Sequence, residues 1–317
     1  SSDVALPISG TSWTSFQSGR NWNLTTVTTT TNFAANDIVG PYNRIGNTYS
    51  LNNGYITDIS ILPYIRSQEV AVRAKGMLIN TTVTGQFDNV DVTSYIRKSN
   101  IIELTGVSGT FNENDIIGYY SSGAFTPTGR VLGVYKYSDT TKVRLYIAGD
   151  GTSTQYSNST VLQNGFYNTA GTYQSTTASG TIASSSHSAG QITNAETTSK
   201  IKLSALASTT NDYYTSNTIY INAGTGVGQS AVISNYVGAN QTAILATSVT
   251  AANGDVYSIG NLKTNEYGNL AGIFNLPGGL FHSGERVLRF DNRTNPSDDS
   301  TATSWAQAPW ALDTVTT

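Results

Sequence analysis

Alternation of side chains in residues 69–75 constrains the fold of this chain more than any other feature. Val70, Val72 and Ala74 fall on one face of the run, and the charged residues Glu69, Arg73 and Lys75 fall on the other. Successive side chains of a β-strand point to opposite faces of its sheet, so a period of two indicates a half-buried strand. The run therefore predicts a strand with one face on a core.

The same pattern continues along the chain. Residues 81–87 alternate again, Asp88 and Asn89 then form a turn signal, and apolar residues resume at 90–96. We expect residues 58–96 to open a β-sandwich.

Composition extends this expectation to all 317 residues. Charged residues make up only 12% of the chain, while it contains 30 glycines, 19 tyrosines and one methionine. Strong helix formers never occur in a long periodic run, and short strands with tight turns account for this composition. The sequence predicts an all-β protein of tandem small antiparallel β-sandwich or barrel domains with an extended N-terminal arm.

Charge and cysteine usage narrow the function classes. A net charge of −3 and a pI near 5.3 argue against a nucleic-acid partner, which is bound by clustered Lys and Arg. No apolar run is long enough to span a membrane, and the absence of cysteine excludes disulfides and thiolate chemistry. Because the chain begins at Ser1 without a leader, we expect a processed protein or a piece of a longer one.

The chain divides into segments of different character. The Thr-rich start contains isolated aromatics such as Trp13 and Trp22, which we interpret as an arm packed on another domain or subunit; a flexible tail is the alternative. Leu104 to Tyr137 and Leu203 to Tyr236 have equal spacing, which indicates a duplicated β-module or two unrelated β-stretches. The predicted organisation is an arm at 1–57, a β-sandwich at 58–98 completed by 262–317, a small β-module at 99–167, a Ser/Thr-rich linker or loop at 168–199, and a second small β-module at 200–261.

Few residues suggest catalysis or metal binding. His187 and His282 are the only histidines, and no Gly-x-Ser-x-Gly motif accompanies them. Oxygen-bearing residues gather from Asp291 to Asp299, which suggests either a calcium site or an Asx-turn loop. We expect the glycines of residues 224–228 to form a β-turn, because a phosphate loop needs a helix after them. We assign no catalytic, cofactor-binding or metal-ligating residue.

Three segments together resemble tail-associated structural proteins of tailed bacteriophages, of the cyanophage and T4-like fibre or baseplate type. They are LPYIRSQEVAVRAKGMLINTTVTGQFDNVDVTSYI at 62–96, IYINAGTGVGQSAVISNYVGANQTAIL at 219–245 and GNLAGIFNLPGGLFHSGERVLRFDNR at 268–293. The resemblance implies a virion structural role in the phage tail, as a fibre, baseplate or collar component. It also implies assembly through β-rich domains and no catalytic residues.

We therefore expect a non-enzymatic virion protein, without a cofactor, whose partners are copies of itself and other virion proteins. A module that binds host-surface glycan is the alternative, and a polysaccharide-degrading tailspike is a third reading. The two outer segments are expected to form one composite domain, with strands near Val70–Ala74 and Val287–Phe290 in the same sandwich and the modules inserted between them.

Overall fold

The structure is a computed structural model, and the predicted arm at 1–57 lies outside the residues that it describes. The described residues are 64–121, 124–149, 156–167, 173–282, 284–295 and 298–312. They belong to two compact units, of which the first comprises Ser1–Gln68, Pro277–Val287 and Pro309–Thr317 and the second Glu69–Leu276 and Leu288–Ala308.

The all-β prediction is confirmed. Regular structure in the described residues consists of β-strands and short 3-10 turns, here η2 (Thr93–Tyr95), η3 (Gly238–Asn240) and η4 (Asp299–Thr301). No helix in this part of the chain is long and apolar enough to cross a membrane.

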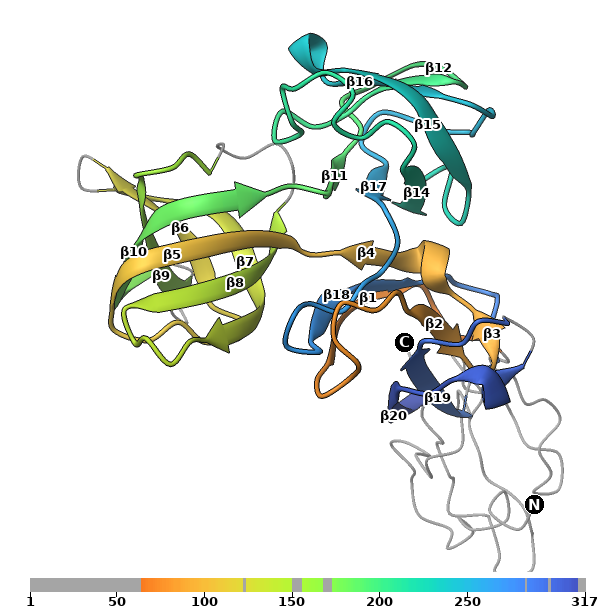
Figure 1. Cartoon of the computed structure of the whole chain (residues 1–317), viewed down its shortest axis with the longest axis horizontal. Helices are drawn as coiled ribbons and strands as arrows, with labels where there is room; N and C mark the ends of the chain where they lie inside the picture. Colours follow the sequence, from red (N-terminus) through yellow and green to blue (C-terminus); the bar gives the residue numbers. More distant parts are fainter. Residues whose placement is uncertain are drawn as a thin grey trace, which may run out of the picture. The chain divides into compact units, whose positions relative to one another are not determined.

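A closed six-stranded barrel lies in unit 2, with neighbours in the order β10-β5-β8-β7-β6-β9 (Figure 1). Alternate residues of its strands, among them Ile102, Leu104 and Leu145, are buried in one core. Gly118 permits tight pairing with the next strand, because a Cβ there would lie 2.0 Å from the Thr126 carbonyl oxygen. The strands are β5 (Asn100–Ser108), β6 (Ile116–Ser121), β7 (Ala124–Lys136), β8 (Lys142–Gly149), β9 (Val161–Tyr167) and β10 (Tyr173–Ser186).

The expected linker or loop at 168–199 is corrected by the structure, because its described residues include β10 and two further strands. β10 closes the barrel by pairing with both β5 and β9. Its inward positions are small: Ala178 and Gly180 precede the single bulky residue Ile182, and all three are buried. The strand was missed because small inward side chains give no apolar signal, while the larger side chains opposite fill the core.

A seven-stranded antiparallel sheet follows, in the order β11-β17-β14-β15-β16-β13-β12. The segment that carries β11 and β12 pairs with both ends of this sheet. Ile192 N–H donates to Asp255 O (2.8 Å), and Thr193 N–H donates to Lys202 O (2.9 Å). The buried side chains of this sheet and its loops form one hydrophobic core. The strands are β11 (Ala189–Gln191), β12 (Asn194–Thr197), β13 (Lys200–Lys202), β14 (Thr218–Ala223), β15 (Ser230–Val237), β16 (Thr242–Leu245) and β17 (Val256–Ile259).

The barrel and the seven-stranded sheet share one neighbour order. β5-β8-β7-β6-β9 in the first corresponds to β13-β16-β15-β14-β17 in the second. The closing segment differs: β10 follows its module in the chain, whereas β11 and β12 precede theirs. This strand-for-strand agreement supports the duplication reading.

The two outer segments of the chain also pair. β18 lies between β1 and β4, and β19 lies between β20 and β2. Phe87 of β2 packs against Phe274 of β18 with ring centroids 5.5 Å apart, so the two sheets share buried residues. β1 and the unit 2 part of β19 therefore lie in neighbouring sheets of one body. Its strands are β1 (Gln68–Ala74), β2 (Thr84–Phe87), β3 (Val90–Asp91), β4 (Ile96–Lys98), β18 (Leu270–Leu276), β19 (Gly284–Asp291) and β20 (Trp305–Leu312).

Unit 1 contributes short described pieces. Ile65 N–H donates to Phe281 O (2.8 Å), and Gly279 N–H donates to Ile65 O (3.0 Å). Tyr64 stacks on His282 with ring centroids 4.5 Å apart.

Candidate functional site

Very short joints connect the β-bodies of unit 2. A single residue, Ser99, separates β4 from β5, and two residues separate β10 from β11 (Figure 1). Asn100 holds the joints together: its Nδ2 donates to Ala189 O (3.0 Å), and its Oδ1 accepts from the N–H groups of Ser188 and Ala189 (both 3.0 Å). Because Asn100 is 1% exposed, these bonds are shielded from water.

Two further bonds brace the same region. Lys98 Nζ donates to Ile259 O at the end of β17 (2.9 Å), and the Tyr214 hydroxyl donates to His187 O (2.6 Å). Segments that are far apart in sequence are thereby fixed against one another inside unit 2.

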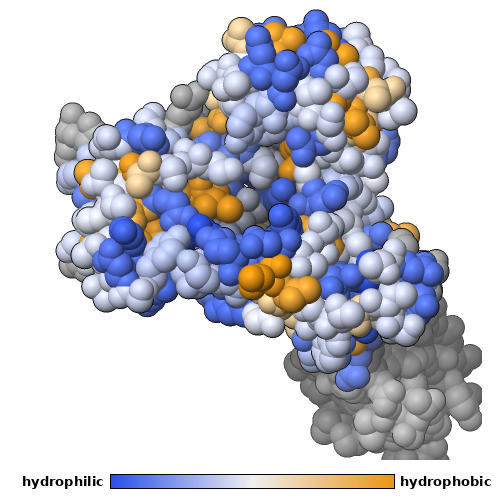
Figure 2. Space-filling view, in the orientation of Figure 1, coloured by the Kyte–Doolittle hydropathy of each residue, from blue (hydrophilic) through white to orange (hydrophobic). Residues whose placement is uncertain are grey.

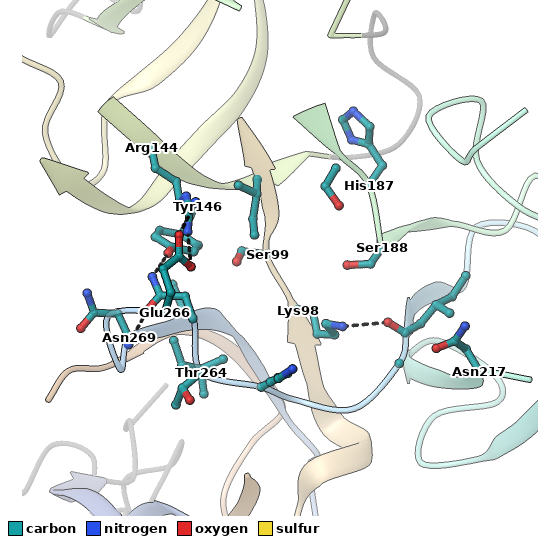
Figure 3. Close-up of a pocket in the computed structure, with 18 of the residues that line it drawn as sticks. Lys98, Ser99, Arg144, Tyr146, His187, Ser188, Asn217, Thr264, Glu266 and Asn269 are labelled. Atoms are coloured by element: carbon teal, nitrogen blue, oxygen red, sulfur yellow. Dashed lines mark hydrogen bonds and ion pairs between the residues drawn. The ribbon is translucent and has the colours of Figure 1, made fainter. Parts of the chain in front are cut away.

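A cavity of about 490 Å³ lies at this junction. Figure 3 shows side chains from the barrel, from both joints and from residues 264–269 around it, and Figure 2 shows a hollow on this face. Its lining combines polar and aromatic side chains with the aliphatic residues Ile101, Ile259, Leu270 and Ala271, as in sites where a few polar groups orient a ligand against apolar surface. The lining includes Lys98, Ser99, Arg144, Tyr146, His187, Ser188, Tyr213, Tyr214, Asn217, Gly260, Lys263, Glu266 and Asn269.

Positive charge exceeds negative charge in this lining. Arg144 is compensated, since it forms ion pairs with Glu103 and with Glu266 (2.7 Å). The hydrogen bond from Arg144 holds the pKa of Glu266 below its usual range. Within the part of the chain that the structure describes, Lys98 and Lys263 have no carboxylate within ion-pair distance. Burial lowers the pKa of Lys98 to about 8, because the ammonium is partly removed from water.

The cavity has a specific polar recess at Gly260. A methyl group on this residue would lie 3.4 Å from Lys98 Nζ and 3.6 Å from Asn217 Oδ1. Asn217 Nδ2 donates to Tyr214 O (3.3 Å), which leaves its Oδ1 toward the recess. A cationic donor and a neutral acceptor thus converge on one small space.

The structure places His187 in the lining of this cavity. Its ring stacks on Tyr156 with centroids 5.6 Å apart, and burial lowers its pKa to about 4. Nδ1 has no hydrogen-bond partner among the described residues, so the carboxylate that would orient a catalytic histidine is not seen there. His282 lies in unit 1, exposed and stacked on Tyr64.

The candidate calcium ligands are engaged in local bonds. Asp291 is fully buried and pairs with Arg293 (2.5 Å) and Arg289 (2.9 Å). Asp298 Oδ1 accepts from the backbone and hydroxyl of Ser300 (3.0 and 2.7 Å). Among the described residues, no three or more His, Cys, Asp or Glu side chains are grouped to hold a metal ion. These bonds agree with the Asx-turn reading.

The glycine-rich loop at 224–228 surrounds a carboxylate of the chain itself. Asp255 accepts from the N–H groups of Thr225 (2.9 Å), Gly226 (3.1 Å) and Ala252 (3.0 Å). A Cβ at Gly224, where φ is +101°, would lie 2.1 Å from Asp255 Oδ1. The loop is a turn closed around Asp255, as the strand that follows it predicts.

Sequence reasoning missed Lys98, Asn100 and Asn217. A short polar break, Arg97-Lys98-Ser99-Asn100, separates apolar residues on either side, and this break marks the first joint. Asn217 carries no such signal, because only the folded chain brings it to Lys98.

No protein-family model, curated protein or solved structure matches this chain. Its function is therefore inferred from the geometry described above.

Proposed function

We propose that this chain is a non-enzymatic virion structural protein of a bacteriophage tail, where it serves as a fibre, baseplate or collar component. Its partners are copies of itself and other virion proteins, and its location is the virion, outside the host cell. The all-β fold and the resemblance of residues 62–96, 219–245 and 268–293 to tail-associated proteins support this proposal.

The observation that carries the proposal is the bracing at the joints. Asn100, at the start of β5, makes two buried hydrogen bonds to Ala189 of β11 and a part-buried one to Ser188. Lys98 adds a bond from β4 to β17. A protein under mechanical load needs its bodies to move together, and short joints closed by buried bonds meet that need.

Self-association through open strand edges has few places in the described strands. The barrel is closed, and the segment with β11 and β12 engages both ends of the seven-stranded sheet. The remaining edges are β1 and β4 of the three-stranded sheet and β3 and β20 of the four-stranded sheet. β3 has two residues, β4 has three, and β20 contains Pro309, which lacks an N–H, so these edges resist pairing with another chain. The seven-residue β1 is the longer exception.

Exposed apolar side chains offer a better contact. Leu78, Ile79 and Trp305 are 52%, 54% and 55% exposed. Leu78 N–H donates to Ser304 Oγ (2.8 Å), which places it beside the residue that precedes Trp305. The Arg289 guanidinium lies 5.3 Å from the Trp305 ring centroid. Trp and Arg dominate binding energy at many interfaces, so we assign self-association to this Trp305 patch, defined as Leu78, Ile79 and Trp305.

Sedimentation velocity of the full chain over a range of concentrations, with electron microscopy of the product, tests the proposal. We expect ordered homo-oligomers, and Trp305→Ala should weaken association at least tenfold without unfolding the chain. Tyr120→Ala is the control, because Tyr120 is 54% exposed and lies on the barrel. A chain that stays monomeric at high concentration and cleaves a capsular polysaccharide contradicts the proposal.

Glycan binding is a second candidate function. The cavity places an exposed aromatic ring beside amide and hydroxyl groups, as in the side chains of Tyr213, Asn217 and Ser188. Sugar recognition uses this combination of a ring face and convergent polar groups.

A further inference from the structure

We propose that the cavity at the joints is a binding site for an acidic saccharide. A sugar hydroxyl occupies the recess formed by Lys98, Asn217 and Gly260, a sugar ring packs at the rim on Tyr213, and the sugar carboxylate is attracted by the positive lining. This inference deepens the glycan-binding candidate and does not depend on the role in assembly.

The recess selects a hydroxyl group. Lys98 Nζ donates and Asn217 Oδ1 accepts, and the two atoms flank Gly260, 3.4 and 3.6 Å from where its Cβ would be, so a ligand hydroxyl that reaches both lies above the Gly260 Cα. A hydroxyl both accepts and donates a hydrogen bond, so it satisfies the two groups at once. A phosphate or carboxylate oxygen only accepts, and it would face the Asn217 oxygen unfavourably.

The rim supplies an aromatic face. Tyr213 is 56% exposed, and its ring is held edge-on against Tyr214 with centroids 4.8 Å apart. The Tyr214 hydroxyl is in turn bonded to His187 O (2.6 Å), so the platform is fixed before a ligand arrives. An ordered tyrosine face provides apolar contact for a pyranose ring at low entropic cost.

Charge selects an acidic sugar over a neutral one. Lys98 and Lys263 line the cavity without a carboxylate partner among the described residues, whereas Arg144 is already paired with Glu103 and Glu266. A partly buried ammonium is stabilised by an anion that enters its cavity. The Asn269 amide and the Ser188 hydroxyl make no side-chain hydrogen bond within the described residues, so they are available to other sugar hydroxyls.

Isothermal titration calorimetry on the full chain tests the inference with three probes. They are a hyaluronan tetrasaccharide, which carries glucuronate; chitotetraose, which is neutral; and sodium acetate, which is the carboxylate alone. We expect saturable binding of the hyaluronan tetrasaccharide, at least tenfold weaker binding of chitotetraose, and no saturable binding of acetate.

Matched variants distinguish binding in the cavity from binding elsewhere on the protein surface. Lys98→Met and Tyr213→Ala should each weaken binding of the hyaluronan tetrasaccharide at least tenfold. Lys75→Met and Tyr120→Ala are the controls, because both side chains are exposed and neither lines the cavity. Circular dichroism checks that each variant is folded.

Several outcomes overturn the inference. They are no binding of the hyaluronan tetrasaccharide at millimolar concentration, equal binding of chitotetraose, or binding unchanged in Lys98→Met. Acetate that binds as tightly as the tetrasaccharide would show an anion site without sugar recognition. Sedimentation of Tyr213→Ala, which leaves the joint bonds of Lys98 and Asn100 in place, reports assembly separately, so failure of saccharide binding and failure of the assembly role are distinguishable.

Discussion

His187 is a base that the fold keeps neutral. Its ring lies on Tyr156, its Nδ1 lacks a partner among the described residues, and burial lowers its pKa to about 4. The unfolded chain, in which the pKa returns to about 6.5, binds more protons between these two values. Protonation of His187 therefore favours unfolding.

The pH dependence of stability tests this residue. Stability should fall as pH decreases from about 6.5 toward about 4, by about 1–2 kcal/mol after allowance for the partial exposure of His187. His187→Gln should remove this part of the loss, measured as urea midpoints at pH 7 and pH 5. His282→Gln is the control, since His282 is exposed, and an equal effect of both substitutions contradicts the assignment.

At the scale of elements, β10 shows how a strand forms with little apolar content. Ala178, Gly180 and Ile182 alternate inward, and a Cβ on Gly180 would lie 3.1 Å from Leu104 Cβ. Leu104 and its neighbours fill the barrel core, so β10 contributes mainly backbone hydrogen bonds and small inward side chains. Packing at protein density leaves no room for a larger side chain there.

Gly180→Val should destabilise the chain by roughly 1–3 kcal/mol, although valine favours strands, because it overpacks the barrel. The matched substitution Ser184→Val, on an exposed position of the same strand, should change stability by less than about 0.5 kcal/mol. Urea unfolding of both variants measures the difference. Stability of Gly180→Val at or above that of the parent chain would show that this position is not packed as described.

For the whole molecule, the main feature is that two segments distant in sequence form one body. β18 pairs with β4, so Ile273 lies opposite Arg97, with the barrel and the seven-stranded sheet inserted between these strands in the chain. β19 likewise pairs with β2. Insertion of this kind places chain entry and exit close together in the host body.

A disulfide tests this pairing in a chain that has no cysteine. The double substitution Arg97→Cys with Ile273→Cys should form an intramolecular disulfide on oxidation, because paired strand residues have Cα atoms within bonding range. Arg97→Cys with Asn275→Cys, shifted by two residues along β18, is the control. Mass spectrometry after thiol labelling reads out both, and two free thiols in the first pair would contradict the register.

The amount predictable from sequence differs between strands and sites. Alternation at 69–75 and the Asp88-Asn89 turn predict β1 and the β2–β3 hairpin, where both turn residues have positive φ. The equal spacing of Leu104–Tyr137 and Leu203–Tyr236 indicates either a duplicated module or two unrelated β-stretches, and the shared strand order is visible only in the structure. The cavity gave no comparable signal, because Lys98, Asn217 and Gly260 meet only after β4 and β17 pack together.

The sequence by itself determines the all-β class and turns such as Asp88-Asn89, because alternation and turn chemistry act between near neighbours. Tertiary structure alone decided that β10 closes a barrel, that β11 and β12 complete a sheet, and that Asn100 braces the joints. These outcomes depend on which surfaces fill one another and on bonds between segments distant in the chain. Such contacts have no period along the sequence, and only the folded chain brings them together.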